Sequence, residues 1–143
     1  MRKVSFIIAC ILFVLSLTAC ENAGITDHVA VDPGSSVRFS QDEIESAAER
    51  VKDKFKDFKG CELTNLWYDE EHSDSFIKGY LRGGKGSLNG ATAENTIVLL
   101  SSFKVDASGG DGSLNPSSTY EGWNWILIRE SESGEWKVDD WGY

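Results

Sequence analysis

Residues 39–61 read FSQDEIESAAERVKDKFKDFKGC, and this stretch contains the clearest structural signal in the chain. Ser40 followed three residues later by Glu43 forms a capping box, and Phe39 and Ile44 are spaced as a hydrophobic staple, so a helix is predicted to begin here. Gly60 is the expected glycine at its C-terminal end. The apolar positions at three- and four-residue spacing are Ile44, Ala48, Val51, Phe55 and Phe58. A helix with one apolar stripe must pack against another element.

The element on which this helix packs is predicted at residues 122–143, GWNWILIRESESGEWKVDDWGY, which hold four of the five tryptophans. A four-residue turn at 131–134 would pair Leu127 with Val138 in a β-hairpin. One face of that hairpin would carry Trp123, Trp125 and Trp136. Trp141 is out of phase with Trp136, so we expect a β-bulge at 139–140 that reverses the register. The aromatic face is then available to cover the helix.

The middle of the chain supplies the rest of the sheet. Residues 61–69 (CELTNLWYD) and 95–106 (NTIVLLSSFKVD) are predicted strands. Residues 74–81 (DSFIKGYL) are compatible with a short helix or with an irregular strand, because Gly79 weakens an otherwise helical apolar face. These elements predict an α+β domain at residues 39–143, in which an N-terminal amphipathic helix packs on a curved antiparallel sheet.

This order of elements resembles the NTF2-like (cystatin-like) fold. The final hairpin, together with GDGSLNPSSTY (110–120) and DWGY (140–143), is similar to small NTF2-like lipoproteins of Gram-positive bacteria. The resemblance covers residues 39–143 and implies a cone-shaped pocket between helix and sheet, and dimers formed through the sheet. NTF2-like domains usually open with more helix than the single long one predicted here.

The N-terminus predicts where the protein is located. Arg2 and Lys3 precede an apolar run at 4–17 that is short for a membrane span, so residues 1–19 are predicted to be a signal peptide. The following LTAC (17–20) resembles a bacterial lipobox, which implies cleavage before Cys20 and a lipid anchor, with fatty acids such as palmitate, on its sulfur. We expect the protein on the extracytoplasmic face of the bacterial cell membrane. Residues 20–38 are predicted to be a flexible stalk that reaches about 50 Å when extended.

Charge and cysteine content exclude several classes of function. The chain carries a net charge of −9, which argues against nucleic acid as a partner and against attraction to an anionic membrane surface. Cys10 is removed with the signal peptide and Cys20 is acylated, so Cys61 is left as a buried small apolar side chain without a disulfide partner. No cofactor is expected.

The glycine-rich loop at residues 106–115 could alternatively be a calcium site. Its oxygen-bearing residues are Asp106, Asp111, Ser113 and Asn115. They do not match the EF-hand spacing, and turns in which Asp and Asn bond to their own backbone explain them better. No metal is therefore expected.

Three functions remain open, because the common catalytic motifs are absent from the sequence. The first is a small-molecule or peptide binding module at the cell surface, with a candidate pocket of Trp67, Tyr120, Trp123, Trp125 and Trp136. Those same aromatic side chains could instead fill the core.

The second function is interaction with a surface protein, or with a second copy of the chain, through the outer sheet face. That face would present Val98, Leu100, Ile126 and Ile128. The third, implied by ketosteroid-isomerase-like relatives, is an enzyme with a pocket carboxylate as general base. The candidate acid/base residues are Asp69, Asp139 and Asp140. Such a carboxylate would be enclosed by tryptophans, whereas a solvated one would face water.

Overall fold

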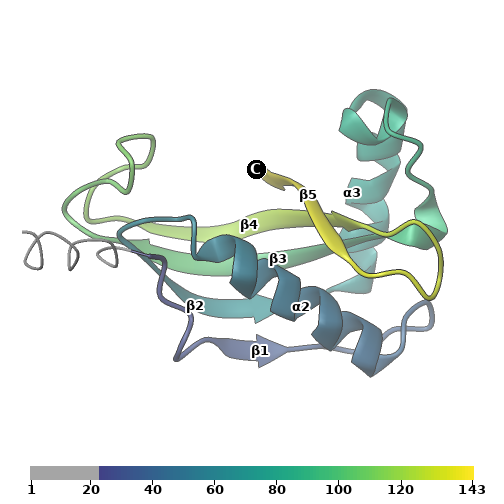
Figure 1. The fold of residues 1–143 in the computed structure, drawn as a ribbon, viewed down its shortest axis with the longest axis horizontal. Coiled ribbons are helices and arrows are strands. Elements are labelled where there is room, and N and C mark those ends of the chain that lie inside the picture. Colours follow the sequence, from purple (N-terminus) through teal and green to yellow (C-terminus); the bar gives the residue numbers. More distant parts are fainter. Residues whose placement is uncertain (1–22) are drawn as a thin grey trace, which may run out of the picture.

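The computed structural model describes residues 23–143 and confirms an α+β arrangement (Figure 1). Its strands are β1 (Ala30–Asp32), β2 (Cys61–Trp67), β3 (Thr96–Val105), β4 (Thr119–Ile128) and β5 (Lys137–Gly142), and its α-helices are α2 (Gln41–Phe55) and α3 (Glu70–Gly83). Two 3₁₀ turns, Lys85–Ser87 and Ala93–Asn95, lie between α3 and β3. The strands form one sheet in the order β1-β2-β3-β4-β5.

Two features of this architecture differ from the prediction. A strand precedes the first described helix, and β1 pairs in parallel with β2, so the sheet is mixed rather than antiparallel. The second long helix, α3, fills the segment whose conformation the sequence left open. Asp69 caps α3 by accepting a hydrogen bond from the His72 backbone N–H at 2.7 Å. Gly79 lies on the exposed side of α3, and the packing of Ile77 and Tyr80 on the sheet outweighs its low helix propensity.

Helix α2 begins as predicted and ends earlier than predicted. The capping box between Ser40 and Glu43 is formed in both directions, which satisfies two N-terminal N–H groups. The helix stops at Phe55 rather than near Gly60, since the Phe58 N–H donates to the Phe55 carbonyl at 2.8 Å and tightens the chain into turns. Gly60 then adopts a φ of 69° and leads directly into β2.

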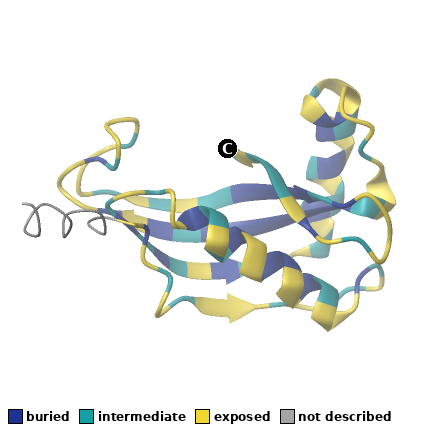
Figure 2. Cartoon of the chain, viewed as in Figure 1, coloured by how far each residue is buried: buried dark blue, intermediate teal, exposed yellow. Residues whose placement is uncertain are grey.

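The two helices cover opposite faces of the sheet. Residues Ile97 and Leu99 of β3 share a core with α2, whereas the alternate residue Val98 packs with Ile77 and Tyr80 of α3. This alternation follows the two-residue period of a strand. Figure 2 shows the resulting buried band along β3 and β4.

The apolar side chains proposed for an exposed outer sheet face are therefore mostly buried. Val98, Leu100 and Ile126 are 1%, 8% and 4% exposed, and Ile128 is partly buried. Because α3 packs on Val98 and Ile126, these residues do not form the exposed patch that pairing through this face would use.

The C-terminal hairpin confirms the predicted register. Leu127 lies opposite Val138, and the Gly134 N–H donates to the Ser131 carbonyl at 2.9 Å within the predicted turn. The register then shifts by one residue, so that Ile126 faces Asp140 and Trp125 faces Trp141. The bulge expected at 139–140 is present.

The first described residues pack on the domain and do not form a free stalk. The Gly24 N–H donates to the Lys56 carbonyl at 2.9 Å, and Ile25 exchanges backbone hydrogen bonds of 2.9 Å with the start of β2. A side chain at Gly24 would lie 2.0 Å from the Phe55 carbonyl oxygen. Sequence patterns miss this segment because it is held by backbone hydrogen bonds rather than by an apolar stripe.

Other parts of the N-terminal prediction concern residues that the structure does not describe. The signal peptide and Cys20 lie outside the described residues 23–143. Within that range, no helix has the length and apolar character needed to cross a membrane.

Candidate functional site

The end of α2, the loop at 106–118 and the last strands enclose a groove of about 400 Å³, which we call the aromatic groove. Its apolar walls are Phe58, Leu114, Trp123 and Trp141. Figure 1 shows the segments that carry the lining residues: the end of α2, the long loop between β3 and β4, and the C-terminal strand. Three segments distant in sequence therefore build one site.

Two irregularities in the strands place the tryptophans of the groove. The bulge in β5 turns Trp141 to the α2 side, where its ring centroid lies 6.2 Å from that of Phe58. A second register shift, between Ser101 and Ser102 of β3, lies opposite Gly122 of β4, which has a φ of 69°. Gly122 directly precedes Trp123, whose ring centroid lies 6.4 Å from that of Phe58.

The aromatic side chains in and beside the groove are not fully buried by the protein itself. Trp141 is 41% exposed, and Tyr143, which packs on Trp123 at 5.2 Å, is 73% exposed. The indole N–H of Trp123 is the one buried side-chain donor or acceptor in residues 23–143 that has no hydrogen-bond partner. A buried donor left unpaired costs about 1–3 kcal/mol. A ligand in the groove would bury the rings that the protein leaves exposed.

The polar rim of the groove carries equal numbers of positive and negative side chains. Lys54 pairs with Asp57 at 2.9 Å, and its ammonium lies 4.8 Å from the Trp141 ring centroid. Lys59 and Asp111 complete the charged rim. Hydrogen bonds from the Ser113 hydroxyl and backbone N–H hold the pKa of Asp111 below its ordinary value. The rim therefore offers both donors and acceptors without net charge.

The five residues predicted to form one pocket do not line a common pocket in the structure, although the Tyr120 and Trp123 rings contact each other with centroids 5.6 Å apart. Trp125 is fully buried and its indole N–H donates to Ser101 Oγ at 2.8 Å, while Trp136 is 3% exposed within the core. Tyr120 stacks on Phe103 beside that core, and Trp67 follows the buried Leu66, which places it on the opposite face of β2. Of the five, Trp123 lines the aromatic groove.

The three candidate general bases all hold structural positions outside the groove. Asp69 caps α3, and Asp140 accepts from the Trp141 backbone N–H at 3.0 Å. Asp139, 13% exposed, accepts hydrogen bonds from the Tyr80 hydroxyl and from the Asn89 amide at 3.1 Å, and pairs with Lys85 at 3.3 Å. Burial first, and then this carboxylate, raise the pKa of Tyr80 to about 12. None of the three is enclosed by tryptophans.

The glycine-rich loop is explained by local turns. Asp106 accepts from the Ser108 backbone N–H at 2.8 Å, and Asp111 bonds to Ser113 in the same way at 3.0 Å. Across residues 23–143, no three His, Cys, Asp or Glu side chains are grouped to hold a metal ion. Cys61 is buried as predicted, and desolvation raises the pKa of its thiol to about 11. The loop contributes Gly110, Asp111, Ser113 and Leu114 to the wall of the groove.

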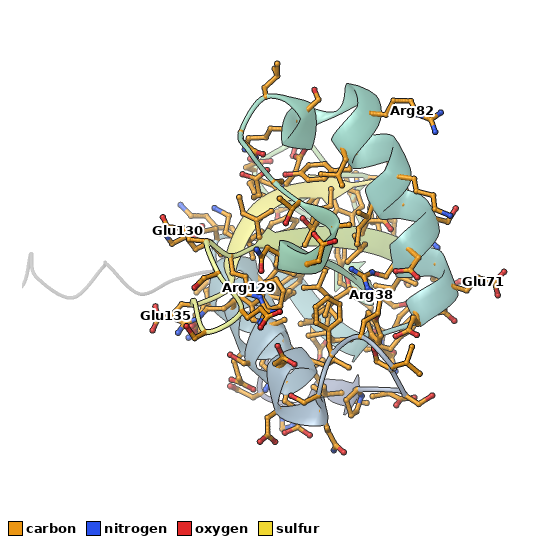
Figure 3. The ribbon with its side chains drawn as sticks, turned by 90° about the vertical axis from the view of Figure 1, so that its right-hand side faces the viewer. Arg38, Glu71, Arg82, Arg129, Glu130 and Glu135 are labelled. Carbon is orange, nitrogen blue, oxygen red and sulfur yellow. The ribbon has the colours of Figure 1, made fainter. Side chains whose placement is uncertain are left out.

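A second hollow, of about 360 Å³, lies at the other end of α2 and includes Arg38 and Arg129 (Figure 3). The Arg129 guanidinium lies 4.4 Å from the Trp136 ring centroid and pairs with Glu43 at 2.6 Å. Arg38 pairs with Asp74. In Figure 3 these arginines lie between the hairpin turn and α3, whereas Glu71 and Arg82 project away from α3. Both guanidinium groups already pair with carboxylates. These ion pairs connect Arg129 to α2 and Arg38 to α3, so we interpret them as structural contacts.

Sequence reasoning placed Trp123 in a candidate pocket but gave several other groove residues different roles. Phe58 belongs to the predicted helix stripe, Asp111 and Ser113 to the glycine-rich loop, and Trp141 marks the predicted bulge. Only the folded chain brings them together. The signal that could have found the site is the combination of an early helix end with the out-of-phase Trp141.

Neither a curated protein nor a solved structure matches the chain. One family model matches residues 40–142, which span both helices, four of the five strands and the whole aromatic groove. The chain therefore belongs to the family described as Domain of unknown function (DUF4829).

Proposed function

We propose that this protein is a lipid-anchored, extracytoplasmic binding module that holds a small molecule or a peptide in the aromatic groove. One observation carries the proposal: Trp141 is 41% exposed on the wall of a groove that the partly buried Trp123 also lines. The volume, about 400 Å³, lies in the range of about 300–1,000 Å³ that ligand pockets occupy.

The distribution of tryptophans supports a binding role for the groove. Trp125 and Trp136 already fill the core and have their own contacts, so the core does not need a third and a fourth indole. Indole rings at a surface offer flat apolar area and lose little side-chain entropy on binding. The carboxylates that an enzyme would use are committed to structural bonds, which favours binding over catalysis.

The finer fold and the anchor are part of the same proposal. A helix lying across long strands that end in a tryptophan-rich hairpin supports an NTF2-like (cystatin-like) fold. In this chain, Phe55 and Trp125 fill the space between α2 and the sheet, so the ligand site lies at the end of the helix. The lipobox-like LTAC supports the anchor on Cys20.

The binding site is tested with the five tryptophan indole N–H signals in NMR spectra of the ¹⁵N-labelled protein. A fragment library and a tripeptide library should yield compounds that shift the Trp123 and Trp141 signals and leave Trp125 unchanged. Trp141→Ala should weaken these compounds by about tenfold, whereas Leu88→Ala, at an exposed position outside the groove lining, should not. If no compound moves either groove signal, the groove is not a binding site.

The anchor is tested separately. Cells that express the chain and grow on labelled palmitate should incorporate label into it, and Cys20→Ser should abolish both the label and membrane association. Label retained in the Cys20→Ser chain would contradict the proposed attachment site.

A further inference from the structure

The distance between the proposed anchor and the folded body is short. Gly24 is fixed by its hydrogen bond to the Lys56 carbonyl, at the end of α2. Cys20 precedes Gly24 by four residues, which span at most about 14 Å. A lipid on Cys20 therefore holds the end of α2 near the bilayer surface, instead of at the end of a stalk of about 50 Å.

The aromatic groove is at this same end. Lys54, Asp57 and Phe58 line the groove and flank Lys56, to which the first described residues are bonded. The first described residues (purple), the end of α2 and the 106–118 loop lie together in Figure 1. The exposed rings of Trp141 and Tyr143 belong to the same region, and Trp and Tyr are the side chains that favour a membrane interface.

The charges of the groove indicate which part of a membrane it fits. Two lysines and two carboxylates line it, so a ligand with only one sign of charge would leave the other pair without a partner. A phosphate joined to an ammonium group supplies both signs. The Trp141 ring already holds the Lys54 ammonium at 4.8 Å, which shows that this ring face accepts a cation.

We propose that the aromatic groove binds the zwitterionic headgroup of a phospholipid, with the phosphate at Lys54 and Lys59 and the ammonium between Trp141 and Asp57. This inference rests on the proposed binding function and on the anchor at Cys20. The Lys54–Asp57 pair is 34% and 68% exposed, and ion pairs this open to solvent contribute little to stability. Both partners can therefore turn to a headgroup at little cost.

The experiment uses the full lipidated chain in lipid nanodiscs, with ¹⁵N-labelled tryptophan. In phosphatidylglycerol nanodiscs, glycerophosphocholine and glycerophosphoethanolamine should shift the Trp123 and Trp141 indole signals and leave Trp136 unchanged. Inorganic phosphate and choline chloride should each bind at least about tenfold more weakly, because each supplies one charge only. In phosphatidylcholine nanodiscs, the two groove signals should already be at the bound positions.

Two surface lysines of α2 provide matched variants that leave the core intact. Lys54→Gln should weaken glycerophosphocholine by about tenfold, while Lys52→Gln, which removes a lysine paired with Glu49 and outside the groove lining, should change the affinity less than about twofold. Equal effects of the two variants would overturn the assignment of the phosphate to Lys54, and with it the proposal.

The remaining outcomes separate this inference from the proposed function. Fragments that bind the groove without any response to headgroups would overturn the headgroup assignment alone. Shifts caused by the soluble probes, with unchanged signals in phosphatidylcholine nanodiscs, would show that the ligand is a soluble phosphodiester and would overturn the membrane assignment.

Discussion

Asp139 and Asp140 are neighbours in β5, and replacing each of them by alanine should have very different effects. The Asp139 carboxylate accepts hydrogen bonds from Tyr80 and Asn89 and pairs with Lys85, which ties the region after α3 to the hairpin. The Asp140 carboxylate accepts one hydrogen bond, from the next backbone N–H. The substitution of Asp139 therefore removes a contact between distant segments, and that of Asp140 does not.

The change in the free energy of unfolding follows from the hydrogen-bond and ion-pair partners that each substitution removes. Hydrogen bonds to a charged group contribute about 1.5–3 kcal/mol, and the Tyr80 hydroxyl, on a side chain that is 5% exposed, would keep only Asn89. The ion pair adds little, because Lys85 is 54% exposed. We expect Asp139→Ala to lower the free energy of unfolding by about 2–3 kcal/mol, and Asp140→Ala by about 0.5 kcal/mol or less.

Equilibrium unfolding in urea, followed by tryptophan fluorescence and circular dichroism, measures both changes. A double-mutant cycle with Tyr80→Phe should give a coupling energy of about 1 kcal/mol or more with Asp139→Ala and none with Asp140→Ala. Similar losses for the two aspartates, or no coupling to Tyr80, would refute this account of the bulge.

Alkaline titration gives an independent check of the same contact. The folded pKa of Tyr80, about 12, is above its ordinary value of 10.0, so the neutral phenol stabilises the folded state. That stability is complete below pH 10 and is lost as the pH rises toward 12. In Asp139→Ala the pKa should fall, but it should stay above 10 because burial is its largest cause.

Three further predictions test the rest of the fold. The backbone hydrogen bond from Ser40 and the side-chain bond from Arg129 lower the pKa of Glu43 below 4.5. The stability that these bonds give should therefore be present above pH 4.5 and be lost as the pH falls through the folded pKa. Acid unfolding of Glu43→Gln, compared with the parent chain, measures this loss. Cys61, with a pKa of about 11, should not react with a thiol reagent at pH 8 until the chain is unfolded, as measured with the other two cysteines replaced by serine. Gly24→Ala should release the first described residues, because its Cβ would lie 2.0 Å from a backbone carbonyl oxygen, and hydrogen exchange should then speed up in β1 and not in β3.

Helix caps and β-bulges depend on residues that are close in sequence, so these features could be predicted. The capping box at Ser40 and Glu43 needs only four residues, and the bulge at 139–140 follows from the phase of Trp141 against Trp136. The sequence of residues 74–81 is compatible with helix or strand because Gly79 interrupts the apolar face, and Asp69, the cap of α3, precedes that segment by five residues. The parallel pairing of β1 has no local signal, because it joins residues about 35 positions apart.

The candidate pocket could not be predicted from the sequence. A tryptophan in the core and a tryptophan in a groove both occupy alternate positions along a strand, so the pattern does not distinguish them. Trp123 and Trp125 both lie on the α2 side, yet Trp125 is fully buried against Phe55 at the end of α2, whereas Trp123 is partly buried and contacts Phe58 beyond the helix. The difference is set by where α2 ends. Had the helix continued to Gly60, its last turn would have occupied the space where Phe58 and the lysines now meet Trp141.

The bulge in β5 links the stability of the domain to its proposed binding site. Regular alternation after Val138 would turn the side chain of residue 141 to the α3 side of the sheet and leave the aromatic groove without its most exposed wall. The extra residue instead places Trp141 on the α2 side, while Asp139, next to Val138, contacts Tyr80 on the other side. A bulge is disfavoured unless something holds it, and here the Asp139 contacts hold it while Trp141 packs against Phe58. The groove therefore depends on a polar contact made on the opposite face of the sheet, so a substitution at Asp139 should alter ligand binding without touching a groove residue.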